Sequence, residues 1–570
     1  MASIPAALSL PRRPDLSGPV LAGIGLLLCV LIGVPVFWLG YFSLTDKAGA
    51  LTLANFIEVA TDESFVDPML TTLGIAVSVA IGSCIVAMPV GWLVARTDMP
   101  FQRTVRALIM ASFVTPPFLG AIAWELLAAP NSGLINQLYR SLFGTAADAK
   151  LFDIYTLTGL IFVISCYTFP YVFVLVANAL DRTPGELEDA SAMLGASAWR
   201  TARRVTIPLA LPALLAGALV AFLQAMTLFG SPAILALPAG FHTMTTKIWS
   251  LFQYPPKPEL AAAASLPLLL MTVILLRGQS ALLGRRGYIV VGGKSGPPQP
   301  VRLGSLRWPA FLLCLAVLCL PVFLPYGALL NAAFSRIASQ PLGLDTVTLH
   351  NVRFVFFELS ATRLAMRNTF LLGLMAATAG TALALVIAYL TARAAITGHR
   401  LLAFLATAPI AIPGIVLGVG LFLAYTRGPV VLYGTLWILL IAYVTIELPA
   451  AYQQLQSAFR SLSPELEEAG RILGASRLRT LRDVTAPLLG PSLIATWCFI
   501  FVAVIRELSA AVILFTSETK VLSVLIFDLK ESGDLGAIAV LGLTMLILTA
   551  AVIIAVNRIP GFSGVRLRNN

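Results

Sequence analysis

The sequence has little charge and very little histidine. Asp, Glu, Lys and Arg make up 11% of its 570 residues, only three residues are His, and 58% are hydrophobic. Soluble globular proteins carry about 25% charged residues, so this composition is typical of a membrane protein. The three histidines are far apart in the chain, and we therefore expect no histidine-based metal site: His242, His350 and His399.

Cysteine is also scarce, and catalytic motifs are missing. The six cysteines all lie inside apolar runs, which favours small buried side chains over disulfides or ligands. The sequence contains no HExxH or GxSxG motif and no repeated carboxylate pair in its apolar runs. These absences argue against an intramembrane protease or transferase, and we expect the chain not to be an enzyme.

Twelve apolar runs are long enough to span a bilayer. They lie near residues 19–43, 70–95, 105–129, 154–180, 209–236, 260–276, 308–334, 369–392, 401–425, 434–458, 488–515 and 535–556. With a cytoplasmic N-terminus, the cytoplasmic segments carry about twice as many Lys and Arg residues as the outer segments. The basic residues flank the runs and form no single patch, so we expect the lipid bilayer, and not nucleic acid, as the partner of this +11 chain. The run from Pro19 is predicted to be a retained anchor.

The chain repeats itself. Residues 186–212 and 465–491 align without a gap, and 16 of the 27 positions are identical. Earlier matches pair Arg96 with Arg393 and Pro116 with Pro413 at an offset of 297, which then falls to 279. The first half therefore has 18 extra residues near 130–153, in a loop predicted to lie outside. The adjacent Pro116 and Pro117 predict a packing kink.

These matches predict an all-α polytopic protein of two homologous halves with six transmembrane helices each. The halves are residues 1–276 and 308–570, and a cytoplasmic linker, 277–307, joins them. The linker contains Gly293-Lys294-Ser295, but the position five before Gly293 is Tyr288 and no strand–loop–helix pattern surrounds it. We interpret this GKS as a chance match and predict that the chain binds no nucleotide itself.

The repeated stretches are polar segments in a very apolar chain, predicted to be cytoplasmic loops at 181–208 and 459–487. In each copy acidic residues begin an interfacial helix and basic residues end it, which suits the helix dipole. Gly195 and Gly474 are expected to interrupt that helix at a turn or a close approach. Pro208 and Pro487 are expected to end it as the chain re-enters the membrane. Two ordinary surface loops would also be amphipathic, but repetition at this level of detail favours a pair of docking elements.

The core of each copy resembles the coupling-helix ("EAA") loop of ATP-binding-cassette importer permeases. It reads Asp189-Ala190-Ser191…Gly195…Val205…Pro208 in the first copy and Glu468-Ala469-Gly470…Gly474…Val484…Pro487 in the second. The first copy has Asp where Glu is usual, and the third position is Ser or Gly. The resemblance implies a type I importer fold in which these loops contact the ATPases: Glu188, Asp189, Ala190, Gly195, Pro208, Glu467, Glu468, Ala469, Gly474 and Pro487.

The resemblance also implies partners, location and cargo. The partners are two copies of an ABC ATPase subunit, which use ATP, and a periplasmic substrate-binding protein; the chain itself needs no cofactor. The location is the bacterial inner membrane, with both termini cytoplasmic. Two fused halves resemble the ferric-iron permeases, and also the 2-aminoethylphosphonate and thiamine permeases. Ferric iron is the expected cargo, with the other two as alternatives.

Charged residues inside apolar runs are candidates for the translocation path, because charge at membrane depth is unfavourable. Arg506 and Glu507 lie in the eleventh run, which in the resembled family lines the path, and Glu447 lies in the tenth. A structural pair that neutralises itself is an equally good reading of Arg506 and Glu507. A secondary transporter remains the alternative class, but such proteins often have inverted repeats. Six spans in each half give the two halves the same orientation, which favours the importer permease.

Overall fold

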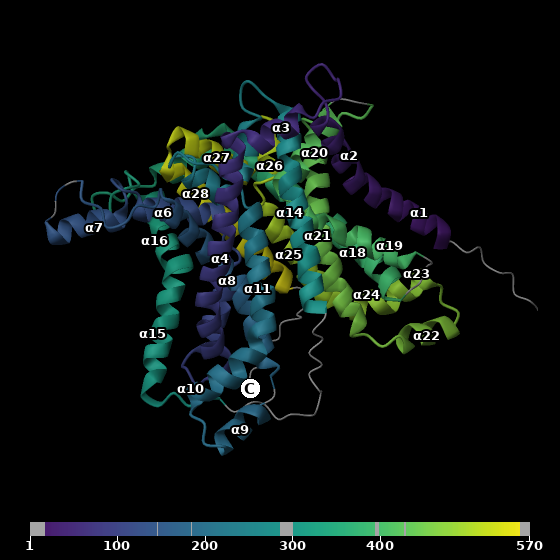
Figure 1. The fold of residues 1–570 in the computed structure, drawn as a ribbon, viewed down its shortest axis with the longest axis horizontal. Coiled ribbons are helices and arrows are strands. Elements are labelled where there is room, and N and C mark those ends of the chain that lie inside the picture. The colour runs from purple at the N-terminus through teal and green to yellow at the C-terminus, as the bar shows by residue number, and fades with distance from the viewer. Residues whose placement is uncertain are drawn as a thin grey trace, which may run out of the picture.

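The computed structural model describes residues 17–144, 146, 148–183, 185–284, 300–393, 398–426 and 429–558. Within these ranges every regular element is a helix, and the long helices run side by side as a bundle (Figure 1). Lipid offers no hydrogen-bond partners to a backbone, so apolar runs of this length form helices that satisfy their own N–H and C=O groups. Residues 285–299 of the predicted linker, including Gly293-Lys294-Ser295, lie outside the described residues.

Each half contains a packed group of three long helices. In the first half these are α4 (Glu63–Arg96), α8 (Leu157–Asp181) and α11 (Ile207–Thr227), which pack against one another. In the second half α18 (Ser360–Ala392), α21 (Leu436–Arg460) and α25 (Gly490–Ile505) pack in the same way. Small residues allow this close approach: a Cβ on Gly217 of α11 would lie 2.8 Å from Val172 Cγ1 of α8. The halves end in α14 (Pro258–Gly284) and α28 (Leu535–Asn557).

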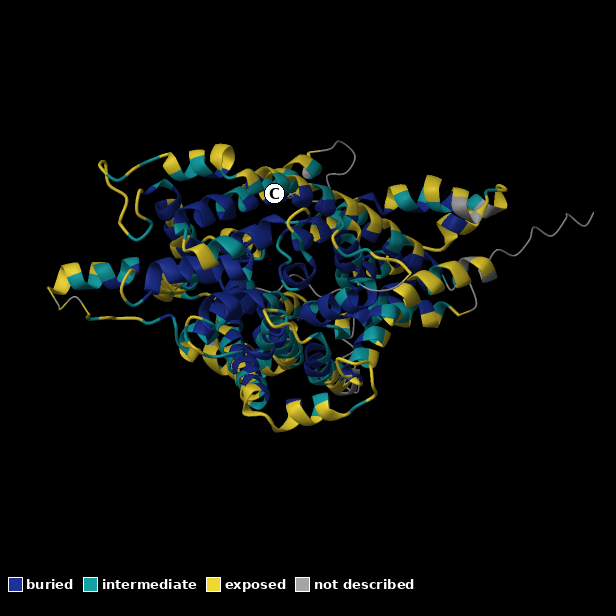
Figure 2. Cartoon of the chain, turned by 90° about the horizontal axis from the view of Figure 1, so that it is seen from above, coloured by how far each residue is buried: buried dark blue, intermediate teal, exposed yellow. Residues whose placement is uncertain are grey.

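The first span of each half packs partly on the other half. The N-terminal span comprises α1 (Ser17–Leu28), the π-helix η1 (Cys29–Gly33) and α2 (Val34–Ser43), and α2 contacts α20 (Gly414–Thr426) as well as α14. The equivalent span, α15 (Arg307–Leu318), η4 (Cys319–Phe323) and α16 (Leu324–Phe334), contacts α5 (Gln102–Ser112) and α6 (Pro117–Ala128). The two sequence repeats are therefore interlocked. Seen from above, buried residues gather where the helices meet and exposed residues follow the outward faces (Figure 2).

Nine helices of the described chain are long and apolar enough to cross a membrane, and the number rises to 12 if each of three bent pairs is one span. Helices α5 and α6 meet at 101°, and the segment α19 (His399–Thr407) with η6 (Ala408–Ala411) meets α20 at 104°. These two bends fall at Pro116 and Pro413, which confirms the predicted kink at Pro116 and repeats it in the second half. The third pair bends by 72° between α24 (Ala486–Leu488) and α25.

Short helices close the end of the bundle that lies opposite the repeated loops (Figure 1). In the first half they are α3 (Ala54–Thr61), α7 (Leu134–Phe143), α12 (Gly230–Leu235) and α13 (Met244–Ser250). In the second they are α17 (His350–Arg353), η5 (Phe354–Glu358), α26 (Ala511–Leu514) and α27 (Leu522–Ser532). A repeated hydrogen bond fixes two of them: Thr72 Oγ1 accepts from Met244 N, and Thr369 Oγ1 accepts from Leu522 N, both at 2.8 Å.

Candidate functional site

The two repeated stretches form matching helical loops at one end of the bundle. The first contains α9 (Glu186–Met193), α10 (Ala198–Thr201) and the π-helix η2 (Ala202–Thr206), which runs directly into α11. The second contains α22 (Glu465–Ile472), α23 (Arg477–Thr480) and η7 (Leu481–Thr485), followed by α24. Helix α9 projects below the long helices of the first half, and α22 projects outward to the lower right beside α24 (Figure 1).

Two details of the expected loop were wrong. The acidic and basic residues do not share one interfacial helix, because α9 ends at Met193 and the basic residues begin the helical run Trp199–Thr227. Pro208 and Pro487 do not end a helix: each occupies one of the first two positions of a helix, α11 or α24. Each proline closely follows a π-helix, η2 or η7, and the chain stays helical on both sides of it.

Gly195 and Gly474 form turns, and nothing packs against them. Their φ angles are +77° and +86°, and no described atom lies within 4 Å of a Cβ built on either. The N–H of Ala196 donates to Ser191 O at 3.1 Å, and Ala475 repeats this bond with Gly470 O. A left-handed glycine followed by this bond is the usual helix C-terminus, so both glycines turn the chain between the two helices of the loop.

Glu188 and Glu467 point into the protein, where each pairs with an arginine from the end of a long helix. Glu188 Oε2 lies 2.9 Å from Arg96 Nη2, and the two side chains are 11% and 1% exposed. Glu467 Oε1 lies 3.0 Å from Arg393 Nε in the second half. Each arginine also donates to a backbone carbonyl just before the loop helix: Arg96 to Thr183 O, before α9, and Arg393 to Leu462 O, before α22. The same clamp thus holds both loops against α4 and α18.

The sequence matched these arginines and glutamates across the halves but did not pair them with each other. The sequence does contain a signal for this pairing, because both partners are repeated in the second half. Arg96 is repeated as Arg393 at the offset of 297, and Glu188 as Glu467 at the offset of 279. Pairing them required knowing that the second and fourth spans of each half are neighbours, as α4 and α8 are.

The opposite face of each loop helix is exposed. Asp189, Ala190 and their equivalents Glu468 and Ala469 lie on this face. Two large apolar residues before each glycine are between 83% and 89% exposed: Met193, Leu194, Ile472 and Leu473. We use the term loop faces for four exposed residues of each loop. They are 189, 190, 193 and 194 in the first loop, and 468, 469, 472 and 473 in the second. Large apolar side chains exposed together in this way are typical of surfaces that contact another protein or lipid.

The two loops differ at one buried contact. In the first loop the hydroxyl groups of Ser191 and Thr201 are 2.8 Å apart and form a hydrogen bond. The second loop has Gly470 in place of Ser191, and Thr480 Oγ1 is buried with no hydrogen-bond partner among the described residues. A Cβ on Gly470 would lie 3.5 Å from that oxygen, which is ordinary van der Waals contact.

The structure corrects the predicted setting of Arg506 and Glu507, because α25 ends at Ile505 and neither residue lies within a helix. Arg506 reaches into the first half, where Nη2 lies 3.2 Å from the Tyr171 hydroxyl of α8 and Nη1 donates to the carbonyl of Phe113. Phe113 lies at the break between α5 and α6. The Arg506 cation therefore joins the second half to the bent third span of the first half.

Glu507 is held separately from Arg506. Its carboxylate accepts from the N–H groups of Ala510 and Ala511 at 3.0 and 3.2 Å, at the start of α26. No ion pair joins Glu507 to Arg506 in the part of the chain that the structure describes, so the two do not neutralise each other as a direct pair. Glu447, on α21, is half-buried and interacts electrostatically with both. The three residues predicted to line the path therefore lie in the same region of the bundle.

A second charged contact joins the halves at the end of the bundle that lies opposite the repeated loops. Lys530 of α27 pairs with Glu125 of α6, and the Tyr155 hydroxyl donates to the same carboxylate oxygen, Oε1, at 2.7 Å. The side chains of Lys530 and Glu125 are 18% and 7% exposed. Arg506 and Lys530 therefore bridge the two halves at two separate points. No cluster of three or more His, Cys, Asp or Glu residues that could hold a metal ion occurs among the described residues.

Known proteins resemble this chain over most of its length. The sequence profile of the family described as "Binding-protein-dependent transport system inner membrane component" matches residues 87–286 and again residues 380–568. The ferric transport system permease protein FbpB of Actinobacillus pleuropneumoniae is 28% identical over 453 residues, which are 79% of this chain and 64% of that protein.

Two further relatives differ in how much of the chain they match. The putative ferric transport system permease protein FbpB 1 of Haemophilus influenzae is 28% identical over 72% of this chain and 64% of its own length. A putative 2-aminoethylphosphonate transport system permease protein, PhnV of Salmonella paratyphi A, is 30% identical over 26% of this chain and 57% of its own length. This chain thus spans 64% of the length of each of these two FbpB proteins.

Proposed function

This chain belongs to the family of binding-protein-dependent transport system inner membrane components, and from that premise we propose that it is the permease subunit of an ABC importer. It forms the path through the membrane for a solute that a periplasmic binding protein delivers. ATP is bound and hydrolysed by two copies of a separate ATPase subunit, and the chain needs no cofactor of its own. The proposed halves are residues 1–276 and 308–570, joined by the linker 277–307.

The observation that carries this proposal is the pair of matching loops. Each presents two highly exposed apolar residues, next to Asp189 or Glu468, on a short helix outside the bundle. Each is held to the membrane-spanning helices by a buried arginine–glutamate pair. A buried ion pair is a firm connection, because leaving either charge alone in that setting is unfavourable. A motion of the bound ATPase can therefore move α4 or α18 through this clamp.

We assign different roles to the predicted coupling residues. Asp189, Ala190, Glu468 and Ala469 contact the ATPase subunits directly. Glu188 and Glu467 position the loops through their arginines, and Gly195 and Gly474 provide the turn that exposes the loop faces. Pro208 and Pro487 begin the helices that re-enter the membrane. These roles are supported by which side chains are exposed and which are paired.

The proposed translocation path runs between the halves, past Arg506, Glu507 and Glu447. Arg506 is half-buried and contacts the first half through two hydrogen bonds, so a relative motion of the halves must break or rearrange them. The proposed location is the inner membrane with both loops cytoplasmic. Cysteines introduced at the exposed Ser197 and Ser476 should then resist a membrane-impermeant thiol reagent in intact cells. A cysteine at Asp148, on the opposite side, should react.

Ferric iron is the proposed cargo. It is supported by two ferric transport permeases that each match more than 70% of the chain. An aminoethylphosphonate is the second candidate, supported by a relative that matches 26% of the chain and by the cationic Arg506, which suits an anionic solute.

Uptake into proteoliposomes tests the proposal. The vesicles contain the permease with its ATPase subunits, ATP inside, and the purified binding protein outside with either labelled ferric iron or labelled 2-aminoethylphosphonate. We expect ATP-dependent accumulation of iron and none of the phosphonate. Accumulation of the phosphonate alone would reassign the cargo. Uptake of either solute without ATP, driven by an ion gradient, would overturn the importer assignment.

A further inference from the structure

The loop that is longer in the first half than in the second contains an amphipathic helix with an unusual orientation. Helix α7 (Leu134–Phe143) extends sideways from the outer end of the bundle, roughly across the direction of the long helices (Figure 1). At 100° per residue, its six apolar residues occupy one face and its four polar residues occupy the other. The apolar face consists of Leu134, Ile135, Leu138, Tyr139, Leu142 and Phe143.

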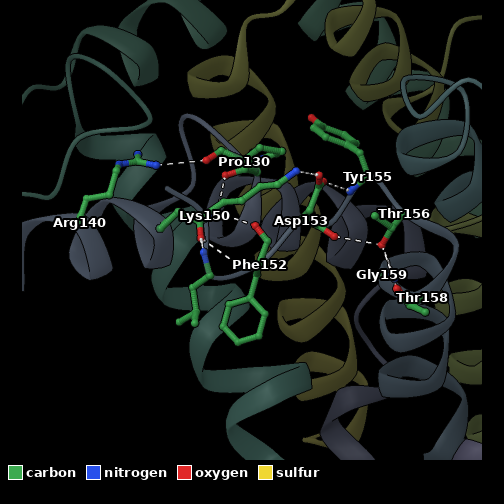
Figure 3. Close-up of polar contacts among 12 residues, drawn as sticks. Pro130, Arg140, Lys150, Phe152, Asp153, Tyr155, Thr156, Thr158 and Gly159 are labelled. Atoms are coloured by element: carbon green, nitrogen blue, oxygen red, sulfur yellow. Dashed lines mark hydrogen bonds and ion pairs between the residues drawn. The ribbon is translucent and has the colours of Figure 1, made fainter. Parts of the chain in front are cut away.

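The polar face of α7 is turned toward the protein and is occupied by backbone carbonyl groups. Arg140 donates to the carbonyl of Pro130, as Figure 3 shows, and to those of Asn131 and Ala149. Asn136 is fully buried and bonds to Ala129 O and Phe152 O as well as to the N–H groups of Leu151 and Phe152. These bonds fasten the helix to the two segments of its own loop that precede and follow it.

One polar contact also attaches α7 to the second half. Gln137 Nε2 donates at 2.7 Å to Ser132 O and to Ser339 O, which lies just beyond the end of α16. Helix α7 is therefore fixed at the outer end of the span formed by α15 and α16. The side-chain hydrogen bonds that orient α7 all come from its polar face. Because the polar face is held against the protein, the opposite, apolar face points outward.

No described part of the chain covers the outer part of the apolar face. Leu138, Leu142 and Phe143 are 58%, 70% and 71% exposed, and no charged residue lies among them. Leu151 and Phe152, at the far end of the loop, are also about half exposed. A helix exposed to water would turn its polar side outward, and α7 does the reverse.

The neighbouring apolar surface belongs to a candidate membrane span. The span Gly304–Phe334 is one of the candidate membrane helices, and Phe323, Leu324 and Leu330 expose their side chains along it. The Gln137–Ser339 hydrogen bond places α7 beside the end of this span, and Figure 1 shows it reaching beyond α16. We propose that α7 lies in the outer leaflet of the bilayer, with Leu138, Leu142 and Phe143 inserted among the lipid acyl chains.

This arrangement gives the permease a lateral anchor on one side only, because the second half lacks the 18-residue insertion. An interfacial helix inserts its apolar face about 5–10 Å into the boundary between headgroups and acyl chains. Through Gln137 the anchor holds the outer end of the first span of the second half. The lipid contact is independent of which solute the permease carries.

Fluorescence quenching in lipid nanodiscs tests this inference. An environment-sensitive fluorescent amino acid is incorporated in place of Leu138, Leu142 or Phe143 of the full-length chain in nanodiscs of phosphatidylethanolamine and phosphatidylglycerol. Ser141, on the polar side of the same helix, and Asp148, in the same loop, provide matched control positions. All five side chains are exposed, so the replacements remove no buried contact.

We expect a lipid carrying a shallow doxyl quencher to reduce the emission at the three apolar positions about threefold more than at the controls. Aqueous iodide should show the opposite order. Iodide quenching at positions 142 and 143 equal to that at 148 would place the face in water and overturn the proposal. Protection from both quenchers would mean that protein covers the face, as a second copy of the chain would, and would also overturn it.

Discussion

Arg96 at the end of α4 and Glu188 in the first repeated loop form a buried ion pair, with 2.9 Å between Nη2 and Oε2. Arg393 and Glu467 repeat this relationship in the second half at 3.0 Å. The pairs connect the exposed loop faces to the longest helices of the bundle, and each also fixes the chain just before its loop. They are the structural basis on which we expect ATPase motions to reach the membrane.

Replacing Arg96 by Gln should release the first loop. Removing one partner of a buried ion pair leaves the other charge uncompensated and typically lowers the free energy of unfolding by about 3–5 kcal/mol. We expect Arg96→Gln to lower the thermal stability of the purified permease and to uncouple ATP hydrolysis from transport.

Arg106→Gln is the matched control for that variant. Arg106 pairs with Asp181 at 2.7 Å near the same end of the bundle, but both side chains are more than one third exposed. Exposed pairs contribute about 0–1 kcal/mol, so this variant should resemble the wild-type protein. Equal effects of the two substitutions on stability and coupling would contradict the role of the buried clamp.

Gly470→Ser should stabilise the second loop. The new hydroxyl group can bond to Thr480 Oγ1, as Ser191 bonds to Thr201 in the first loop. The hydrogen bond and the better helix propensity of Ser together favour α22 by about 1 kcal/mol. Amide hydrogen exchange of α22 in the purified permease measures this effect, and we expect exchange to slow by about fivefold.

Ser191→Gly makes the reverse change in the first loop and should speed the exchange of α9. If Gly470→Ser leaves the exchange of α22 unchanged or faster, the Thr480 hydroxyl has another partner, and the interpretation of this difference between the loops is wrong.

His242 predicts a pH dependence of stability. It lies outside the membrane-spanning helices, between α12 and α13, and burial, helped by the charge of Lys247, lowers its pKa below the ordinary value of 6.5. The unfolded chain therefore takes up a proton at a higher pH than the folded protein does. Stability conferred by neutral His242 is present above pH 6.5 and is lost as the pH falls below it.

Thermal unfolding of the permease between pH 7 and pH 5 tests this expectation. His242→Gln should flatten the decline in unfolding temperature that the wild-type protein shows over about this range. His350→Gln, at an exposed histidine of another outer segment, is the control and should retain the decline. An unchanged slope in His242→Gln would contradict the prediction.

Arg506 should matter for transport beyond its role in folding. Arg506→Gln removes the cation and a hydrogen bond to a charged group, which is worth about 1.5–3 kcal/mol, so we expect uptake to fall by about 10- to 100-fold. Assembly with the ATPase, followed by co-purification, should be unchanged. Tyr171→Phe removes one hydroxyl partner of Arg506 and keeps the cation, so its effect on uptake should be smaller.

The outcome of this pair of variants separates the two interpretations of Arg506. If both variants fail to assemble with the ATPase, Arg506 is a structural link between the halves. The assignment of Arg506 to the translocation path would then be dropped.

Much of the architecture was predictable because lipid imposes simple rules on a chain. Apolar length gave the spans, and the repeat at Pro116 and Pro413 indicated where two of them bend. The end of α25 at Ile505 was not predictable, because Arg506 and Glu507 are flanked by apolar residues on both sides. The contacts that the two residues make there include Phe113, Tyr171 and Ser523. Local sequence does not contain those contacts.

Some features of the repeated loops were also predictable from the sequence, and others were not. Their helical content, their acidic start and the turn glycines follow from residue types at short range. Which face of α9 or α22 is exposed depends on Arg96 and Arg393, which are about 90 and 75 residues away in the chain. The sequence therefore predicted the coupling residues as one group, and the geometry separates those that can contact a partner from those that hold the loop.

The central claim is that the two loop faces bind ATPase subunits, and co-purification of the permease with its ATPase through detergent tests it most directly. Leu194 and Leu473 are the most exposed large apolar residues of these faces. The double variant Leu194→Asp, Leu473→Asp should lose the ATPase while the permease itself elutes as before, and Leu344→Asp, at a fully exposed leucine of an outer loop, should retain it. Full retention of the ATPase by the double variant would contradict the account.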